Sequence, residues 1–502
     1  MIKILTSEQI RVADRLTIEQ EPVASIDLME RAAQACTDYI CSQTAPGIPV
    51  HIICGKGNNG GDGLAIARQL WRRGKNITVW ITEDTGNPSA DFKVNLERLQ
   101  SGTDVVIHSP STPPAFQEYK GALLIDAIFG SGLNRNPEGK AAEMIKAINK
   151  SGAHVISVDI PSGLFADQHT RHHEGIVCAA TTLVFQTPRP CFMYAAYERY
   201  IGHFEVLEIG LRDAVLQEME AYGFIPDHSS IAALLPFRPL FGHKGTFGHA
   251  LLLAGAKGKT GAAILAARAA LRSGTAMVTV RAPGCSLIPL QTAAPEAMCL
   301  PDPGTEYLEE PVKQGKFTGA GIGPGIGIAH ETGNVLKRLI QDFDAPLVID
   351  ADAINLLSEN KTWLNFLPAG CILTPHPGEF ARLVGNIEDP FERTAEQLKF
   401  AARYNCFLIL KGRFTAIACP DGQLFFNPTG NNGMSKAGAG DVLTGLITGL
   451  LAQGLGPMKA ALLGVYLHGL AGDLCREETS AYGMTSGDLV EYLPAAFRSL
   501  EM

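Results

Sequence analysis

Short apolar runs alternate with amphipathic runs along the first half of the chain. The apolar runs predict buried strands, and the runs with apolar residues three and four positions apart predict helices. Strands are predicted at residues 49–54, 77–82, 105–108, 122–126 and 154–158, and helices from residue 7 and at 25–40, 64–73, 90–100 and 138–150. This alternation is typical of a parallel, doubly wound α/β sheet, whose binding site lies beyond the carboxyl ends of its strands.

The alternation stops between residues 211 and 230 and then resumes, so a boundary is expected there, between domains spanning 1–215 and 225–502. In the second half, strands are predicted at 250–254, 277–281 and 347–353, from Cys371 until two prolines stop it, and from Phe407 to Lys411. An alanine-rich helix is predicted within 258–274, and the glycine-rich residues 319–327 are expected to form a flexible loop.

Length and composition narrow the class of protein. A chain of 502 residues is too long for one hydrophobic core, so two or three domains are expected. The net charge of -9 argues against nucleic acid and anionic membranes as partners. The eleven cysteines form no C-x-x-C pair, the N-terminus lacks the apolar segment of a signal peptide, and no apolar run approaches the ~20 residues that span a bilayer. These features predict reduced, mostly buried thiols in a cytoplasmic protein.

The segment that follows the first predicted strand, Gly55–Gly63, is rich in glycine. It matches G-x-G-x-x-G, and Glu83 lies about twenty residues further on, as in a dinucleotide-binding fold. However, Asn58, Asn59 and Asp62 are unusual in the loop of a dehydrogenase, and an acid at a helix start weakens pyrophosphate binding there. This motif is the only feature that favours a dehydrogenase.

Oxygen-bearing residues stand at three strand ends of the first half. Asn59, Asp126 and Ser162 offer the oxygen ligands that suit a hard cation, although each could instead satisfy a neighbouring loop. Asp159 leaves its strand just before Pro161, which prevents the strand from continuing. This position makes Asp159 a candidate for chemistry, with a structural cap as the alternative.

In the second half, the glycine-rich start of Asn427–Leu451 is predicted to lead into a helix near Asp441. Free N–H groups at a helix start bind anions, so a carboxylate there is suited to take a proton from a hydroxyl that attacks a phosphate. An ordinary helix cap is the alternative for Asp441. Gly258–Thr260 resembles the end of a P-loop, but the position of its first glycine is Leu253, so a Walker A motif is rejected.

Other charged residues are predicted at the same rim of the second sheet. Lys411 ends one strand, Asp350 and Asp352 end another, and His376 and Glu379 are expected to be exposed at the end of a third. A lysine for nucleotide phosphates, acids for Mg²⁺ and a base make up the layout of a phosphoryl-transfer site.

Six motifs carry a resemblance to a known family: G-N-N-G-G-D-G at Gly57–Gly63, V-D-I-P-S-G at Val158–Gly163, H-K-G-T-F-G at His243–Gly248, T-P-H-P-G-E at Thr374–Glu379, L-K-G at Leu410–Gly412 and G-A-G-D-V-L-T-G at Gly438–Gly445. In this order they resemble the bifunctional NAD(P)H-hydrate repair enzymes, over nearly the whole chain. The resemblance implies an N-terminal Rossmann-like three-layer α/β/α sandwich and a C-terminal ribokinase-like α/β/α domain. It also implies metabolite repair: an epimerase interconverts the R and S forms of hydrated NADH or NADPH, and a dehydratase restores NAD(P)H from the S form with ADP, releasing AMP and phosphate.

By this resemblance, the epimerase site binds its substrate through two loops and one aspartate: Asn58, Asn59, Gly60, Gly61, Asp62, Gly130, Ser131, Gly132, Leu133, Asn134, Arg135, Asn136 and Asp159. Asp159 is the implied catalytic residue. Asn59, Asp126 and Ser162 are the implied ligands of K⁺.

The resemblance implies a dehydratase pocket lined by Ala262, Gly325, His376 and Asp441, with Asp441 as the catalytic base. The adenine nucleotide, ADP with Mg²⁺, would be held by Lys411, Gly412, Arg413, Phe414, Thr415 and Gly440. Arg413 and Phe414 stand where the family usually has small residues, and Ala437–Ala439 replaces a more usual Gly/Thr-containing sequence. These departures concern local nucleotide contacts and not the fold.

The implied partners are hydrated NADH or NADPH and ADP, without nucleic acid or membrane, in a homo-oligomer. The alternative is a ribokinase-like kinase of a small molecule such as a vitamin precursor, fused to a non-catalytic dinucleotide-binding module. Such kinases often carry N-x-x-E where this chain has His376-Pro-Gly-Glu379, and a kinase would leave the first domain without a role.

Overall fold

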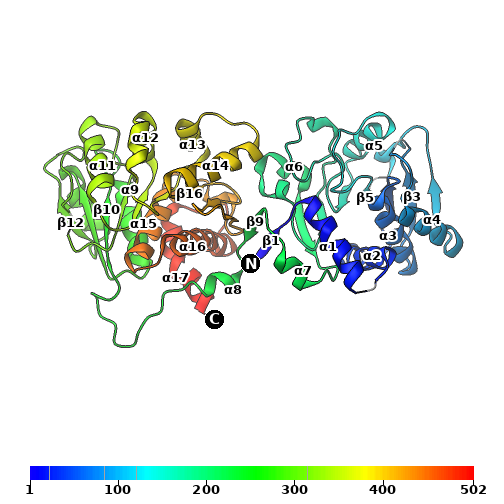
Figure 1. The fold of residues 1–502 in the computed structure, drawn as a ribbon, viewed down its shortest axis with the longest axis horizontal. Coiled ribbons are helices and arrows are strands. Elements are labelled where there is room, and N and C mark those ends of the chain that lie inside the picture. The colour runs from blue at the N-terminus through cyan, green and yellow to red at the C-terminus, as the bar shows by residue number, and fades with distance from the viewer. Residues whose placement is uncertain (22, 84, 120, 314, 502) are drawn as a thin grey trace. The chain divides into compact units, whose positions relative to one another are not determined.

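The computed structural model describes residues 1–21, 23–83, 85–119, 121–313 and 315–501 (Figure 1). The chain forms two compact units, Lys3–Gly223 and Phe224–Met502 with Met1–Ile2, here called the N-terminal unit and the C-terminal unit. Each unit contains a largely parallel sheet covered by helices on both faces. The predicted fold class, α/β with two three-layer domains, is confirmed.

The sheet of the N-terminal unit is parallel, in the order β4-β3-β2-β5-β6-β7-β8. Its strands are β2 (Val50–Cys54), β3 (Ile77–Ile81), β4 (Val106–His108), β5 (Leu123–Ala127), β6 (His154–Val158), β7 (Thr181–Phe185) and β8 (His203–Leu207). The helices are α1 (Ser7–Gln20), α2 (Ser25–Gln43), α3 (Asn58–Arg72), α4 (Ala90–Gly102), α5 (Gly139–Lys150) and the short α6 (Glu198–Ile201) and α7 (Asp213–Glu218). Ile52 and Ile125 pack with α2 and α3, whereas Ile53 and Leu124 pack with α5. Successive residues of a strand point to opposite faces, so both faces of β2 are buried and its run is continuously apolar.

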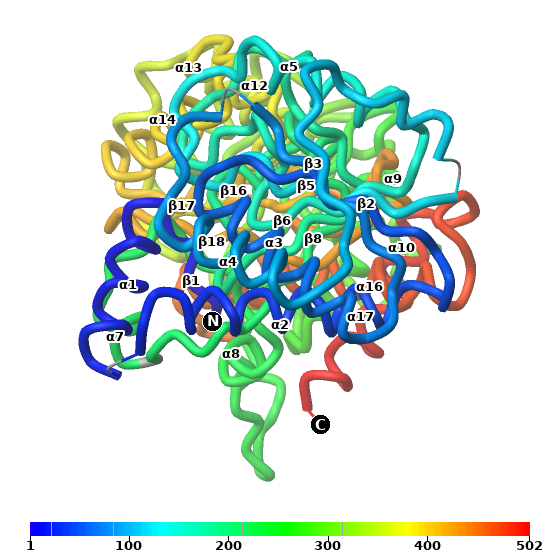
Figure 2. Tube along the Cα trace, turned by 90° about the vertical axis from the view of Figure 1, so that its right-hand side faces the viewer, coloured from blue at the N-terminus to red at the C-terminus, as the bar shows by residue number. Residues whose placement is uncertain are grey.

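The sheet of the C-terminal unit has the order β1-β9-β18-β17-β16-β15-β14-β13-β10-β11-β12 and is parallel from β16 to β12. Its strands are β1 (Ile2–Ile4), β9 (Gly223–Ile225), β10 (His249–Leu253), β11 (Met277–Ala282), β12 (Met298–Pro301), β13 (Gly319–Ile322), β14 (Leu347–Ile349), β15 (Ile372–Leu373), β16 (Phe407–Leu410), β17 (Ala416–Ala418) and β18 (Leu424–Phe426). The helices are α8 (His228–Ala232), α9 (Thr260–Arg272), α10 (Gly284–Ala293), α11 (His330–Asp342), α12 (Ala351–Glu359), α13 (Pro377–Val384), α14 (Pro390–Tyr404), α15 (Ala439–Ala452), α16 (Pro457–Glu478) and α17 (Ser486–Glu501). In Figures 1 and 2, α12 to α14 and α16 to α17 lie on opposite sides of the sheet.

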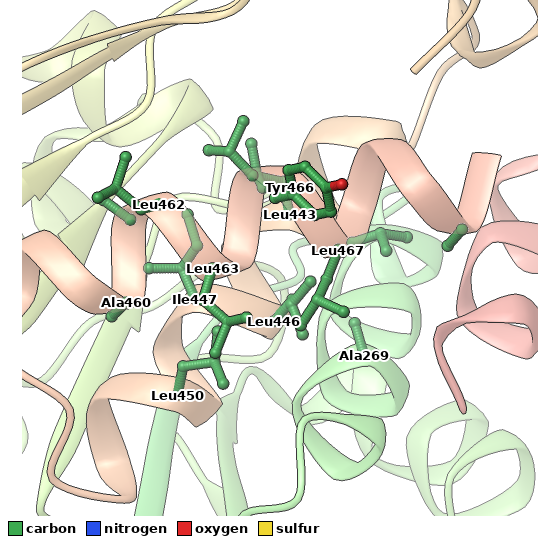
Figure 3. Packing of buried hydrophobic residues seen from close by; sticks show 14 of the residues in the cluster. Ala269, Leu443, Leu446, Ile447, Leu450, Ala460, Leu462, Leu463, Tyr466 and Leu467 are labelled. Atoms are coloured by element: carbon green, nitrogen blue, oxygen red, sulfur yellow. The ribbon is translucent and has the colours of Figure 1, made fainter. Parts of the chain in front are cut away.

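The core of the C-terminal unit is built around α15. Figure 3 shows Leu443, Leu446 and Ile447 of this helix packed against Leu463 and Leu467 of α16, all of them buried. Helix α15 packs even more closely against α9. At Gly445 the two helices approach so closely that an added Cβ would lie 2.0 Å from the carbonyl oxygen of Ala266. A helix so tightly enclosed holds its N-terminus in a fixed position at the edge of the sheet.

Several predicted elements differ from the structure. Helix α3 begins at Asn58, so most of the glycine-rich segment is helical, and Gly319–Ile322 is the buried strand β13 instead of a flexible loop. Asp352 lies in the first turn of α12 and not at a strand end. Glu379 is buried, which contradicts its predicted exposure, whereas His376 is exposed as predicted. Strands β1, β7, β8, β9, β12, β17 and β18 were not predicted.

The segment between α8 and β10 projects from its unit in both Figure 1 and Figure 2. It carries the exposed side chains of Phe237, Leu240 and Phe241. All eleven cysteines are free and seven of them are buried, as predicted. Within the described part of the chain, no helix combines the length and apolar character needed to cross a membrane.

Candidate active sites

Asp159 lies directly after β6 in a left-handed backbone conformation, with φ of 65°. Its carboxylate is held at both oxygens: Arg189 Nη2 donates to Oδ1 at 2.8 Å, and the N–H of Ser131 donates to Oδ2 at 2.8 Å. Burial opposes ionisation of Asp159, but the Arg189 guanidinium and Ser131 outweigh it, and the pKa is lowered below its ordinary value. A strained backbone and a fixed, ionised carboxylate are features of a functional residue.

Asp126 and Ser162, two of the predicted cation ligands, are in contact and fully buried. Ser162 donates to Asp126 through its hydroxyl at 2.6 Å and its N–H at 2.9 Å, and Ser157 Oγ donates at 2.8 Å. Burial raises the pKa of Asp126, while these hydrogen bonds oppose the rise. Asn59 is 8% exposed, and neither polar atom of its amide has a hydrogen-bond partner among the described residues. A buried amide oxygen without a partner is the kind of ligand that suits a hard cation.

The loop from Gly130 covers both Asp159 and Asn59. A Cβ at position 130 would lie 3.0 Å from Asp159 Oδ2 and 3.3 Å from Asn59 Cβ. A cavity of about 430 Å³ lies there, lined by Ser7, Ile10, Arg11, Asp14, Gly57, Asn58, Asn59, Asp62, Thr85, Ile128, Phe129, Gly130, Ser131, Gly132, Leu133, Asp159, Phe185, Arg189, Ile209 and Leu211. An adjoining cavity of about 350 Å³ includes Leu133, Arg135 and Asn136. The two cavities share Thr85, Phe129 and Leu133, so they lie side by side.

Most of the predicted epimerase residues therefore lie together. Gly60, Gly61 and Asn134 line neither cavity, and the two glycines have another role. A Cβ at Gly60 would lie 1.9 Å from the carbonyl oxygen of Gly55, and one at Gly61 would lie 2.9 Å from Met29 Sδ. These glycines permit the close approach of α3 to its neighbours. The face of α3 that carries these two glycines packs against neighbouring residues. A ligand could therefore contact Gly60 and Gly61 only through their backbone atoms.

At the edge of the C-terminal sheet, Lys411 follows β16 and Asp350 follows β14. Lys411 Nζ lies 2.8 Å from Asp350 Oδ1, and the hydroxyl of Thr444 donates to Asp350 Oδ2 at 2.7 Å. Asp350 is buried, while Lys411 is partly exposed. One carboxylate thus joins the end of β16 to the second turn of α15.

Asp441 lies in the first turn of α15, which begins after Gly438 with φ of 94°. Burial raises the pKa of Asp441 to about 7, with a further rise from Asp350 that Lys411 opposes. A Cβ at Gly440 would lie 3.1 Å from Lys411 Nζ. The lysine, the backbone of Gly440 and a carboxyl group that titrates near neutral pH are therefore brought together, as the sequence predicts.

The predicted pocket residues Ala262 and Gly325 also meet, because a Cβ at position 325 would lie 3.1 Å from Ala262 Cβ. Beside them, Lys259 Nζ lies 2.9 Å from Asp352 Oδ2, which also accepts the N–H of Gly327 at 2.8 Å. These contacts hold the loop after β13 against the start of α9.

The other predicted dehydratase residues stand at the rim of the same edge. His376 caps α13, accepting the N–H of Gly378 through Nδ1 at 3.0 Å, and its side chain is half exposed. Gly412 and Thr415 close a turn through their mutual hydrogen bonds, with Arg413 donating to the carbonyl of Pro428 at 3.0 Å. Phe414 lies beneath the Arg413 guanidinium, 4.8 Å from it. The two unusual residues of this turn thus contact one another.

Four residues of these sites were missed by reasoning from sequence: Asp14, Arg189, Asp350 as a partner of Lys411, and Thr444. Arg189 stands between two prolines, which is the one local signal that could have marked it. The position of Asp14 in an amphipathic helix carries no such signal.

Each unit thus presents an ionisable aspartate at the carboxyl edge of a parallel sheet. The C-terminal site combines a lysine, a glycine-rich helix start and a carboxyl group, as in enzymes that transfer phosphoryl groups between bound molecules.

Comparison with known proteins also divides the chain into an N-terminal and a C-terminal part. The family described as YjeF-related protein N-terminus matches residues 25–191, and the family described as NAD(P)H-hydrate dehydratase matches residues 250–495. The bifunctional NAD(P)H-hydrate repair enzyme Nnr of Moorella thermoacetica is 35% identical over 518 aligned positions, covering 99% of this chain and 97% of that protein. Nnr of Escherichia coli is 31% identical, covering 97% of this chain and 92% of that protein.

The chain belongs to the family of bifunctional NAD(P)H-hydrate repair enzymes. Among solved structures, the ADP/ATP-dependent NAD(P)H-hydrate dehydratase of Bacillus subtilis, co-crystallised with ATP and Mg²⁺, is 32% identical with a TM-score of 0.48, over 56% of this chain and 99% of that chain. The alternative of a kinase fused to a non-catalytic module is not favoured, because whole bifunctional repair enzymes align with the full length of the chain.

Proposed function

We propose that the N-terminal unit interconverts the R and S forms of hydrated NADH and NADPH, and that the C-terminal unit dehydrates the S form with ADP, releasing AMP and phosphate. Family membership over the whole chain supports this function. The observation that carries it is that each unit has its own carboxyl-based site: Asp159 with Arg189, and Asp441 with Lys411 and the start of α15.

In the epimerase site, the proposed substrate contacts run from Asn58 to Asp62 and from Gly130 to Asn136. All of these residues except Gly60, Gly61 and Asn134 line one of the two adjoining cavities. Asp159 is the proposed group that exchanges a proton with the substrate hydroxyl. We assign Asn59, Asp126 and Ser162 to K⁺, which would supply positive charge to the site when bound. The contact of Ser162 with Asp126 and the partnerless amide of Asn59 support this assignment.

In the dehydratase site, Asp441 is the proposed base. It would take the proton of the substrate hydroxyl, which then attacks the β-phosphate of ADP to give a phosphate ester and AMP. Loss of phosphate from the ester restores the nicotinamide ring. Lys411 and the N–H groups near Gly440 would hold the transferred phosphate, because both carry positive charge toward it.

The remaining assignments concern residues at the carboxyl edge of the C-terminal sheet. Ala262, Gly325 and His376 would border the nicotinamide hydrate, and the turn from Gly412 to Thr415 would contact the nucleotide. Mg²⁺ would neutralise charge on the phosphates when bound. We assign Mg²⁺ to those phosphates and not to Asp350, because the ammonium group of Lys411, 2.8 Å from Asp350 Oδ1, offsets the negative charge that would attract a second cation.

A direct assay tests the proposal. Purified protein is mixed with hydrated NADH, ADP and Mg²⁺, and the absorbance of reduced nicotinamide is followed. Asp441→Asn should abolish recovery of NADH, whereas Asp159→Asn should leave repair of the S form intact and stop conversion of the R form. Failure of the unaltered protein to recover NADH with any adenine nucleotide would rule out the dehydratase function.

A further inference from the structure

The epimerase cavity contains more carboxyl groups than the binding of a phosphate-bearing substrate requires. Asp14 from α1, Asp62 from α3 and Asp159 after β6 all line it, together with Arg11 and Arg189. Asp62 interacts electrostatically with both other aspartates. Because like charges repel phosphates and one another, such a group of acids has to serve a purpose other than anion binding.

Asp14 is the member of this group whose contacts are incomplete. Its Oδ1 atom is shielded from solvent and has no hydrogen-bond partner among the described residues. An unsatisfied buried polar atom costs about 1–3 kcal/mol, so such atoms are found where a ligand completes the contact. The amide of Asn59, 8% exposed and without a partner, lines the same cavity. Two polar groups that lack partners therefore line the same cavity.

The environments of Asp14 and Asp159 favour opposite protonation states. Burial raises the pKa of Asp14 to about 6, with Arg189 opposing the rise and Asp159 adding to it. The pKa of Asp159 is lowered, because Arg189 and Ser131 outweigh its burial. A pair of carboxyl groups with separated pKa values is the usual arrangement of a general acid beside a general base.

We propose that Asp14 is a second catalytic residue of the epimerase, which exchanges a proton with the leaving or arriving hydroxyl while Asp159 serves the opposite face of the ring. The inference rests on the proposed epimerase function and assigns a new residue to it. It gives a role to the acid that α1 contributes to this cavity.

The chemistry of the substrate requires two such groups. Hydration of a dihydronicotinamide adds water to an enamine, so the hydroxyl is attached to the carbon beside the ring nitrogen. Asp14 gives its proton to this hydroxyl, the C–O bond breaks, water leaves, and the nitrogen lone pair forms a C=N bond. Water then attacks the opposite face of that carbon, and its proton passes to Asp159.

This step is balanced. One water leaves, one water enters, and one proton moves from Asp14 to Asp159, without an oxidant or reductant. Conversion in the reverse direction returns the proton by the same route. In repeated turnover in one direction, it returns through solvent or Asp62.

The test compares Asp14→Asn with the unaltered full-length protein, with Asp159→Asn, and with Glu19→Gln, which makes the same carboxyl-to-amide change at an exposed position of α1. Conversion of the R form and uptake of heavy oxygen from labelled water into the hydrate are measured, with binding of the hydrate by calorimetry. Loss of a general acid typically costs ~100-fold or more, so Asp14→Asn should lose both conversion and oxygen exchange to that extent. Binding and repair of the S form should stay within about threefold, and Glu19→Gln should behave as the unaltered protein.

Asp14→Glu distinguishes loss of the acid from a folding defect. It keeps the carboxyl group, so it should retain more conversion of the R form than Asp14→Asn. Near-normal conversion by Asp14→Asn, while Asp159→Asn is inactive, would overturn this inference and leave the proposed function standing. A loss that binding alone explains, or equal losses in Asp14→Glu and Asp14→Asn, would also overturn it. Normal conversion by Asp159→Asn would instead refute the epimerase assignment of the whole cavity.

Discussion

The ammonium group of Lys411 and the carboxylate of Asp350 lie 2.8 Å apart at the carboxyl edge of the C-terminal sheet. Asp350 is 1% exposed and also accepts a hydrogen bond from Thr444. This carboxylate therefore fixes the lysine next to Gly440, where a nucleotide phosphate would lie. It also places a negative charge near Asp441 and helps to keep that group protonated up to neutral pH.

Replacing Asp350 with asparagine should destabilise the C-terminal unit. Breaking a buried ion pair commonly costs 3–5 kcal/mol, and because Lys411 is partly exposed we expect about 2 kcal/mol. Urea denaturation, followed by circular dichroism, measures the effect. Asp421→Asn, in the exposed turn between β17 and β18, is the matched control and should change little. Equal stabilities of the two variants would contradict a structural role for the pair.

The rate of S-form repair should rise with pH through about 7, because Asp441 acts as a base only after it loses its proton. Asp350→Asn should move this midpoint to lower pH, since the charge of Asp350 raises the pKa of Asp441. Single-turnover rates between pH 5 and pH 9, roughly the range over which such a group titrates, provide the measurement. A midpoint that does not respond to Asp350→Asn would exclude Asp441 as the titrating base.

The same pKa affects stability with a definite sign. The folded-state pKa of Asp441 lies above its ordinary value of 3.8, so the folded protein binds more protons than the unfolded chain between 3.8 and about 7. The contribution of Asp441 to the free energy of unfolding therefore decreases as pH rises through this interval. Asp441→Asn should remove this dependence, which denaturation at several pH values can detect.

A glycine in the middle of α15 should be intolerant of substitution. In Gly445→Ala the new methyl group would lie 2.0 Å from the carbonyl oxygen of Ala266 in α9, so the two helices would have to separate. We expect a loss of about 3 kcal/mol in the free energy of unfolding. Gly261→Ala in α9, where a Cβ meets nothing within 4 Å, should be neutral or slightly stabilising, by about 1 kcal/mol or less. Thermal denaturation of both variants measures the two effects, and equal stabilities of Gly445→Ala and Gly261→Ala would contradict the prediction.

The sequence predicts the parallel strands well, because a strand buried on both faces is a short apolar run between polar turns. The prediction from sequence is wrong at Gly319–Ile322, where the glycines indicate a loop but the structure has strand β13. There the glycines serve close packing, since a Cβ at Gly321 would lie 2.3 Å from the hydroxyl of Thr448 in α15. A similar approach of Gly60 to Gly55 explains why α3 begins within a segment that is unusually rich in glycine.

The site residues divide in the same way. Asp159 and Lys411 are found from sequence because they directly follow strands, and the ends of parallel strands gather at one edge of a sheet. Asp14 and Arg189 reach the epimerase cavity from a helix and from a connection far along the chain. Their roles depend on contacts between distant segments, which no local pattern encodes.

Removing the counter-charge of Asp159 should shift the acid side of the epimerase pH profile. In Arg189→Gln the guanidinium that lowers the pKa of Asp159 is lost, so the carboxylate becomes protonated at a higher pH and conversion of the R form declines earlier on acidification. The same ion pair also affects stability, because folding lowers the pKa of Asp159. The contact between Arg189 and Asp159 therefore stabilises the folded protein above the ordinary pKa of 3.8. This contribution is lost as pH falls through the folded-state pKa. The stability difference between Arg189→Gln and the unaltered protein should therefore be largest near neutral pH and disappear in acid. Arg199→Gln, at an exposed position, is the control, and an unchanged acid limb in Arg189→Gln would show that Asp159 is not the group that sets it.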